Sequence, residues 1–129
     1  MNPNQKRGTR KQLIRVLIAD DRLISRNGLK ALLATQIEID IVGEAADGQE
    51  AIQMVAECRP DVVLIDVRMP MIDGLEATRM IKGKWPEVKI IVLTMYPSHQ
   101  TQALAAGADA FLVKGYATED LLAAVCKEK

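Results

Sequence analysis

The stretch DVVLIDVRMPMIDG, residues 61–74, begins as a strand and ends as a turn that leads into a helix. Four consecutive apolar residues, 62–65, precede Asp66, whose charge is costly to bury without a partner. Pro70 then turns the chain, and Asp73 is placed to cap the helix that follows. The stretch therefore predicts a buried central strand that carries a carboxylate at its end.

Four other runs of the sequence are similarly rich in valine, isoleucine and leucine, and they are nearly continuous rather than alternating. Such runs are typical of strands that are covered on both faces. They read IRVLIAD (14–20), IDIVGEA (39–45), VKIIVLT (88–94) and ADAFLVK (108–114). Segments with helical spacing separate them. Five strands alternating with five helices predict an α/β fold: a three-layer (βα)5 flavodoxin-like, doubly wound parallel sheet with strand order 2-1-3-4-5.

The helical segments carry recognisable start signals. DGQE (47–50) and DGLE (73–76) each place a capping aspartate three residues before a glutamate, and Thr118 can cap the last helix. The fourth helical segment, residues 98–106, is rich in alanine, with Leu104 as its one large anchor. We therefore expect this fourth helix to be short and loosely held.

Composition and charge divide the 129 residues into a short tail and one domain. The hydrophobic residues are 49% of the chain and the aromatic residues 3%, so the core should be aliphatic. The first fifteen residues contain no acid and carry five of the 17 basic residues: Lys6, Arg7, Arg10, Lys11 and Arg15. We expect residues 1–12 to be a disordered basic tail and residues 13–129 to be the domain. A basic arm can contact nucleic acid, but the acidic body argues against a DNA-binding surface on the domain itself.

Cysteine usage and hydropathy exclude several other classes of protein. Cys58 and Cys126 are too far apart for a metal knuckle or a redox pair, so we interpret both as small core residues. No apolar run approaches the ~20 residues that span a bilayer, and no hydrophobic signal segment is present. The expectation is a cytoplasmic protein without a membrane partner.

Polar residues stand at the carboxyl ends of four predicted strands. Asp20 and Asp21 end the first strand and Asp66 the third, while Thr94 and Lys114 end the fourth and fifth. With strand order 2-1-3-4-5, the first and third strands are neighbours at the switch point where ligands of such sheets bind. The three carboxylates should therefore converge on one crevice.

These residue types suit phosphoryl transfer. Converging carboxylates repel one another unless a cation enters, and Mg²⁺, or Mn²⁺ in its place, takes oxygen ligands and leaves room for a phosphoryl group. Asp66 is the candidate oxygen nucleophile, and the Thr94 hydroxyl and Lys114 ammonium can meet phosphate oxygens. Taken singly, each residue also has a plainer interpretation, as a turn former, a β-branched strand residue or a solvated charge.

The same segments resemble the receiver domain of bacterial response regulators, most closely the NarL/FixJ type. The resemblance covers about residues 15–125 and rests on four motifs: VLIADD (16–21), DVVLIDVRMPMIDGLEA (61–77), KIIVLTMY (89–96) and ADAFLVKGY (108–116). It implies that Asp66 accepts a phosphoryl group from a phosphohistidine of a sensor histidine kinase.

The resemblance also implies roles for the residues around Asp66. Asp21 and Asp66 would hold Mg²⁺ together with the backbone carbonyl of Arg68, and Asp20 would help directly or through a water molecule. Thr94 and Lys114 would bind the phosphoryl oxygens, and Phe111 would be the switch aromatic that turns inward as Thr94 moves. The other interpretation of Phe111 is a plain core aromatic.

The sequence departs from the family pattern at several positions. Gly115 follows Lys114 where most receivers have a cis proline, so glycine's conformational freedom must shape this loop. Arg22 stands where the subfamily often has histidine. Arg68 and Tyr96 occupy positions that influence how fast phosphate is lost, and their sizes suggest a partly screened site.

The resemblance favours a receiver within a DNA-binding transcriptional regulator. Its helix-turn-helix output domain would follow Lys129, which would leave the last helix cut short, and receivers of this kind commonly form homodimers. Such a chain is not an enzyme, although it can lose its own phosphate. The alternatives are a stand-alone receiver that acts as a phosphorelay or protein-interaction module, an aspartate-dependent phosphatase, and a receiver that signals without phosphate. The phosphatase would need an acid where Arg68 stands.

Overall fold

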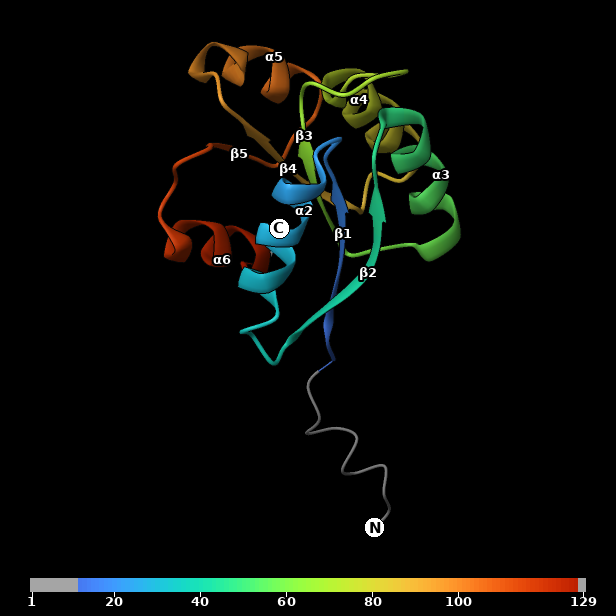
Figure 1. Ribbon diagram of the computed structural model, residues 1–129. Coiled ribbons are helices and arrows are strands. Elements are labelled where there is room, and N and C mark those ends of the chain that lie inside the picture. Colours follow the sequence, from blue (N-terminus) through green and yellow to red (C-terminus); the bar gives the residue numbers. More distant parts are fainter. Residues whose placement is uncertain (1–11, 128–129) are drawn as a thin grey trace.

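The computed structural model describes residues 12–127, which form one parallel sheet between two layers of helices (Figure 1). The basic segment predicted to be disordered lies outside this range apart from Gln12, and its disorder stays a prediction. The elements are, in order, β1 (Ile14–Ala19), α2 (Leu23–Leu33), β2 (Ile39–Ala45), α3 (Gly48–Cys58), β3 (Val62–Asp66), α4 (Gly74–Lys84), β4 (Lys89–Thr94), the 3₁₀ helix η1 (Pro97–His99), α5 (Gln100–Ala105), β5 (Ala110–Val113) and α6 (Thr118–Cys126).

The strand order is β2-β1-β3-β4-β5, and every neighbouring pair is parallel, so the predicted fold class and strand order are confirmed. The register brings the carboxyl ends of the strands level with one another. Ala19 of β1 pairs with Ile65 of β3, and Asp66 pairs with Leu93 of β4. Residues that end β1, β3 and β4 therefore meet at one edge of the sheet.

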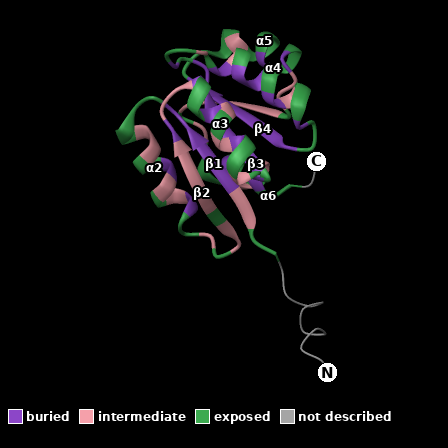
Figure 2. Ribbon diagram, turned by 90° about the vertical axis from the view of Figure 1, so that its right-hand side faces the viewer, coloured by how far each residue is buried: buried purple, intermediate pink, exposed green. Residues whose placement is uncertain are grey.

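Two apolar layers explain why the central strands are nearly continuous runs of aliphatic residues. Along β3, Val63 and Ile65 belong to the core that includes residues of α3 and α4, whereas Val62 and Leu64 belong to the core that includes residues of α2 and α6. All four side chains are buried. Figure 2 shows β1, β3 and β4 largely buried, while β2 at the sheet edge is only partly covered. Both faces of the central strands are therefore covered by helices and shielded from water.

Two of the three predicted helix caps are present. The Asp47 carboxylate accepts a hydrogen bond from the Glu50 N–H at 2.7 Å, and Asp73 Oδ1 accepts from the Leu75 and Glu76 N–H groups at 2.9 Å each. The predicted cap at Thr118 is wrong, because Ala117 occupies the cap position and Thr118 is already the first helical residue. The amino end of α6 therefore has no side-chain cap.

Removing the Asp73 cap should weaken the protein. We expect Asp73→Ala to lower the free energy of unfolding by ~1 kcal/mol, because two N–H groups at the start of α4 lose their acceptor. Thr118→Ala is the matched control and should change stability by less than ~0.5 kcal/mol, since Thr118 makes no cap bond. Urea denaturation of both variants measures the difference, and equal losses would contradict this account.

The helix α5 is short, as predicted, but its anchor differs from the predicted one. Leu104 is 50% exposed, whereas Ala103 and Ala106 are buried. Small side chains thus face the core here and let the backbone of α5 lie close to the rest of the domain. Gly107 follows with φ of +104°, a conformation that favours glycine and ends the helix.

Two further expectations concern the cysteines and the membrane. Cys58 is half-buried, but Cys126 is exposed, so its interpretation as a core residue is wrong. The helix α6 turns Leu121 and Val125 to the core, and the next position along the helix points away from it.

Among residues 12–127, no helix combines the length and the apolar character needed to cross a bilayer.

Candidate functional site

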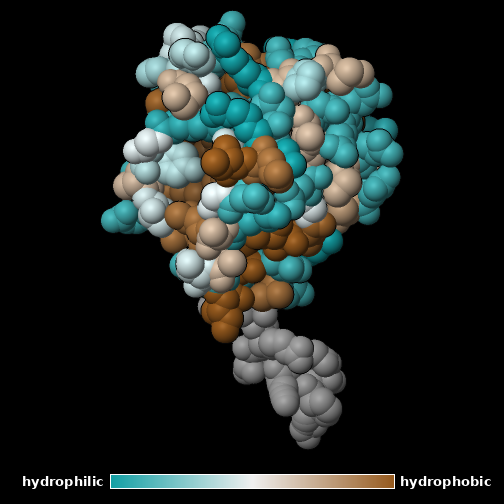
Figure 3. Space-filling model, viewed as in Figure 1, coloured by the Kyte–Doolittle hydropathy of each residue, from teal (hydrophilic) through white to brown (hydrophobic). Residues whose placement is uncertain are grey.

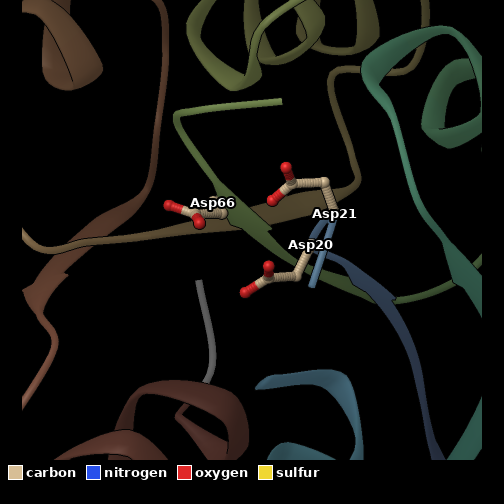
Figure 4. A group of neighbouring side chains, drawn as sticks. All are labelled: Asp20, Asp21 and Asp66. Carbon is tan, nitrogen blue, oxygen red and sulfur yellow. The ribbon is translucent and has the colours of Figure 1, made fainter. Parts of the chain in front are cut away.

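Three carboxylates from β1 and β3 gather at the carboxyl edge of the sheet. Asp20 directly follows β1 and is 2% exposed, and Asp66, the last residue of β3, is 9% exposed, while Asp21 lies at the surface. One carboxylate oxygen from each residue lies within 4.8 Å of the others. Figure 4 shows the three side chains grouped at the ends of these two strands. The predicted convergence is thus present.

Lys114 connects two of these carboxylates. Its Nζ lies 3.0 Å from Asp20 Oδ2 and 3.2 Å from Asp66 Oδ2. The Lys114 N–H donates to the Thr94 carbonyl at 2.7 Å, which holds the end of β5 against β4. The next residue, Gly115, has φ of +101°, and residues 12–127 contain no cis peptide bond. Glycine therefore shapes this loop, as the sequence predicts.

The charges at the site are not balanced by Lys114 alone. Burial raises the pKa of Asp66 above its ordinary value, and the nearby Asp20 charge adds to this, although Lys114 opposes both. For Lys114 itself, burial lowers the pKa, but the hydrogen bond to Asp20 and the charges of Asp66 and Asp20 outweigh it, so its pKa is raised. Negative charge at the site thus exceeds what one lysine compensates.

A cavity of about 260 Å³ opens beside Asp66 and is also lined by Asp21, Arg68 and Thr94. Asp21 lines this cavity, and its carboxylate accepts no hydrogen bond from residues 12–127. Carboxylate oxygens of this number and spacing fit a hard divalent cation such as Mg²⁺. The cavity can also hold a phosphoryl group in contact with Asp66.

Backbone contacts fix the two buried aspartates. The Arg22 N–H donates to Asp20 Oδ1 at 2.9 Å, and the Val67 N–H donates to Asp66 Oδ1 at 2.8 Å. Arg22 also lines the cavity beside Asp66. The two carboxylates are therefore oriented before any ligand enters.

The Thr94 hydroxyl has a partner that the sequence did not indicate. Thr94 is 1% exposed, and its Oγ1 lies 2.8 Å from Nδ1 of His99, the only histidine in the chain. The ring of Tyr96 packs against His99, and the Arg68 guanidinium lies 4.7 Å from the Tyr96 ring centre. The only signal in the sequence for this contact was a single histidine five residues after the threonine that ends β4.

The predicted switch residue, Phe111, is half-buried and packs against the core cluster that contains residues of α3 and α4. This position agrees with both interpretations given above. Its role as a switch stays a prediction, as does the role of the Arg68 carbonyl as a metal ligand.

The sequence model of the protein family described as the response regulator receiver domain matches residues 16–126. YhcZ from Bacillus subtilis, described as an uncharacterized transcriptional regulatory protein, is 42% identical over 111 residues, which are 84% of this chain and 52% of YhcZ. The chain spans about half the length of the curated relatives it matches.

Solved structures agree with the sequence comparison. A two-component response regulator of the LuxR family from Aurantimonas sp. SI85-9A1 has a TM-score of 0.84 and 29% identity, covering 92% of this chain and 89% of that chain. A chain from the CheX-CheY-BeF3-Mg²⁺ complex of Borrelia burgdorferi has a TM-score of 0.81 and 27% identity, covering 87% of this chain and 86% of that chain. The chain therefore belongs to the family of response regulator receiver domains, and its relatives include two-component regulators of the LuxR type.

Proposed function

We propose that Asp66 accepts a phosphoryl group from a phosphohistidine of a sensor kinase in the cytoplasm. The observation that carries the proposal is the position of Asp66, a nearly buried carboxylate that touches Lys114 and opens on a cavity shared with Asp21 and Thr94. A lone structural aspartate would not need two further acids and a lysine around it.

The residues around Asp66 account for the transfer. Asp66 Oδ1 is held by the Val67 N–H and Oδ2 by Lys114, so the carboxylate is fixed when the donor arrives. An Asp66 oxygen forms a bond to phosphorus as the bond between phosphorus and the imidazole nitrogen of the donor breaks. The Lys114 ammonium and the Thr94 hydroxyl then donate to the phosphoryl oxygens.

The proposal includes Mg²⁺ held by Asp20, Asp21 and Asp66 with the Arg68 carbonyl. The acidic cluster supports it, and so does the Mg²⁺ named for the similar Borrelia complex. The cation would neutralise charge on the transferring group and between the carboxylates. Asp21, which is exposed and accepts no hydrogen bond from the described residues, is the carboxylate most open to it.

A protein donor would find an apolar surface next to the site. Figure 3 shows hydrophobic side chains gathered on this face, where α2 carries Ile24, 81% exposed, and Leu23. A second cavity, of about 240 Å³, is lined by Ile24 together with Asp20 and Lys114. An exposed apolar patch of this kind is typical of a protein-binding surface.

We further propose that the phosphorylated receiver controls a DNA-binding output domain and thereby transcription. The regulatory relatives support this, since they are about twice as long as the matched region and both YhcZ and DegU are named transcriptional regulatory proteins. The length of the natural gene product separates this proposal from a stand-alone receiver.

Phosphoryl uptake should depend on the cation. We expect incubation with acetyl phosphate and Mg²⁺ to add one phosphoryl group, detected by intact mass, and excess EDTA to lower the rate of uptake by ~100-fold or more, since uncompensated carboxylates repel the donor. Mn²⁺ added beyond the amount that the EDTA can bind should restore uptake. Equal uptake with and without the cation would contradict the proposed metal site.

A further inference from the structure

The hydroxyl of Thr94 has two hydrogen-bond partners within the protein. Its Oγ1 accepts a hydrogen bond from the Tyr96 N–H at 3.2 Å and lies 2.8 Å from His99 Nδ1. A hydroxyl has one proton to donate. If that proton is directed to His99, it is not available to a phosphoryl oxygen on Asp66. The two acceptors therefore compete for one donor.

The imidazole of His99 is held in place for this contact. The backbone N–H of His99 donates to the Tyr96 carbonyl at 3.1 Å, and the two rings meet edge to face with centres 5.5 Å apart. Tyr96 in turn lies under the Arg68 guanidinium, beside the cavity that holds Asp66. His99 is half-buried, at the last position of η1, and α5 follows without a break.

We propose, on the basis of the proposed function, that His99 is a positioning residue that retains the Thr94 proton while Asp66 is unphosphorylated. In this state the imidazole carries its proton on Nε2, and Nδ1 accepts from Thr94. When Asp66 carries phosphate, the Thr94 hydroxyl rotates to donate to a phosphoryl oxygen, and the bond to His99 breaks. His99, and with it η1 and the start of α5, is then released.

This competition gives phosphorylation a route to α5. The helix is short, and within it only Ala103 is buried, so few contacts oppose its displacement. The bond between Thr94 and His99 stabilises the unphosphorylated arrangement by the free energy of one hydrogen bond. This corresponds to about a three- to tenfold change in the equilibrium between the two arrangements. His99 therefore tunes the switch rather than creating it.

The bond can be tested without phosphorylation, because the single imidazole gives one set of nitrogen signals. We expect ¹⁵N spectra of the unphosphorylated protein to show an Nε2–H tautomer with Nδ1 accepting a hydrogen bond. In Thr94→Val, which keeps the branched shape but lacks the hydroxyl, the Nδ1 signal should move toward that of a free imidazole. Identical Nδ1 signals in the two proteins would overturn the proposal.

The effect of the bond between Thr94 and His99 on phosphorylation is tested by treating variants with Mg²⁺ and a limiting amount of acetyl phosphate. His99→Ala should raise the ratio of phosphorylated to unphosphorylated protein about three- to tenfold, because the bond lost exists only before phosphorylation. His99→Asn, whose amide places a polar atom near the Nδ1 position, should stay near the unmodified protein. His99→Gln, whose amide lies one bond further out, should behave like His99→Ala.

Two controls separate this inference from the proposed function. In a Thr94→Val background, His99→Ala should have no further effect, since no hydroxyl remains to be retained. An effect that persists there, or alanine and asparagine variants that behave alike, would overturn the inference while phosphorylation itself stands. Absence of phosphoryl uptake by the unmodified protein would instead refute the proposed function, and with it the release of His99 on phosphorylation. The ¹⁵N spectra would still test whether Thr94 and His99 are hydrogen-bonded.

Discussion

Asp66→Asn should abolish phosphoryl uptake and leave the protein folded. The amide nitrogen and oxygen cannot replace the carboxylate as the attacking group, so intact mass after incubation with acetyl phosphate and Mg²⁺ should show no added phosphoryl group. Stability should be equal or higher, because burial raises the pKa of Asp66 and thus opposes its charge. Lys114 keeps Asp20 as its partner in the variant.

Asp40→Asn is the matched control for this change. Asp40 is an exposed residue of β2, away from the carboxyl edge of the sheet, and the same substitution there removes the same charge. Its uptake should equal that of the unmodified protein. Full uptake by Asp66→Asn would show that another residue accepts the phosphoryl group.

Gly74→Ala is expected to damage the fold strongly, although it adds only one methyl group. A Cβ on Gly74 would lie 1.9 Å from the backbone oxygen of Asp66, and the Gly74 N–H donates to the Val67 carbonyl at 2.7 Å. Because the overlap is with backbone, no side-chain rotation relieves it. We expect the free energy of unfolding to fall by at least ~3 kcal/mol, and Asp66 to be displaced.

Gly83→Ala provides the control within the same helix. A Cβ at Gly83 would meet nothing within 4 Å, and alanine favours the helix, so this variant should gain ~0.5 kcal/mol. Urea denaturation of both variants gives the comparison. A Gly74→Ala protein as stable as the Gly83→Ala protein would contradict the close contact between α4 and the end of β3.

The sheet and its acidic edge could be predicted because they depend on patterns that reach across whole elements. The apolar run before Asp66 is long enough to require cover on both faces, and parallel strands place their carboxyl ends at one edge. Asp20, Asp66, Thr94 and Lys114 follow from that placement, without any knowledge of side-chain contacts.

Details that depend on one turn of helix could not be predicted in the same way. The alanine-rich segment does not fix its own rotation, so the burial of Ala103 rather than Leu104 depends on packing. The cap at Ala117 depends on where the backbone becomes helical, which the sequence leaves open by a residue. The contact of His99 with Thr94 depends on how residues 95–98 turn after β4, and the position of a histidine five residues after the threonine does not fix that turn.

Chemical mapping of the phosphoryl group tests the central claim most directly. An aspartyl phosphate is an acyl phosphate, so borohydride reduces it to a homoserine that peptide mass spectrometry locates. After treatment with acetyl phosphate and Mg²⁺, we predict reduction at Asp66 alone, within the peptide that contains residues 61–74. Reduction at Asp20 or Asp21, or phosphate that resists borohydride, would contradict the assignment of Asp66 as the phosphoacceptor.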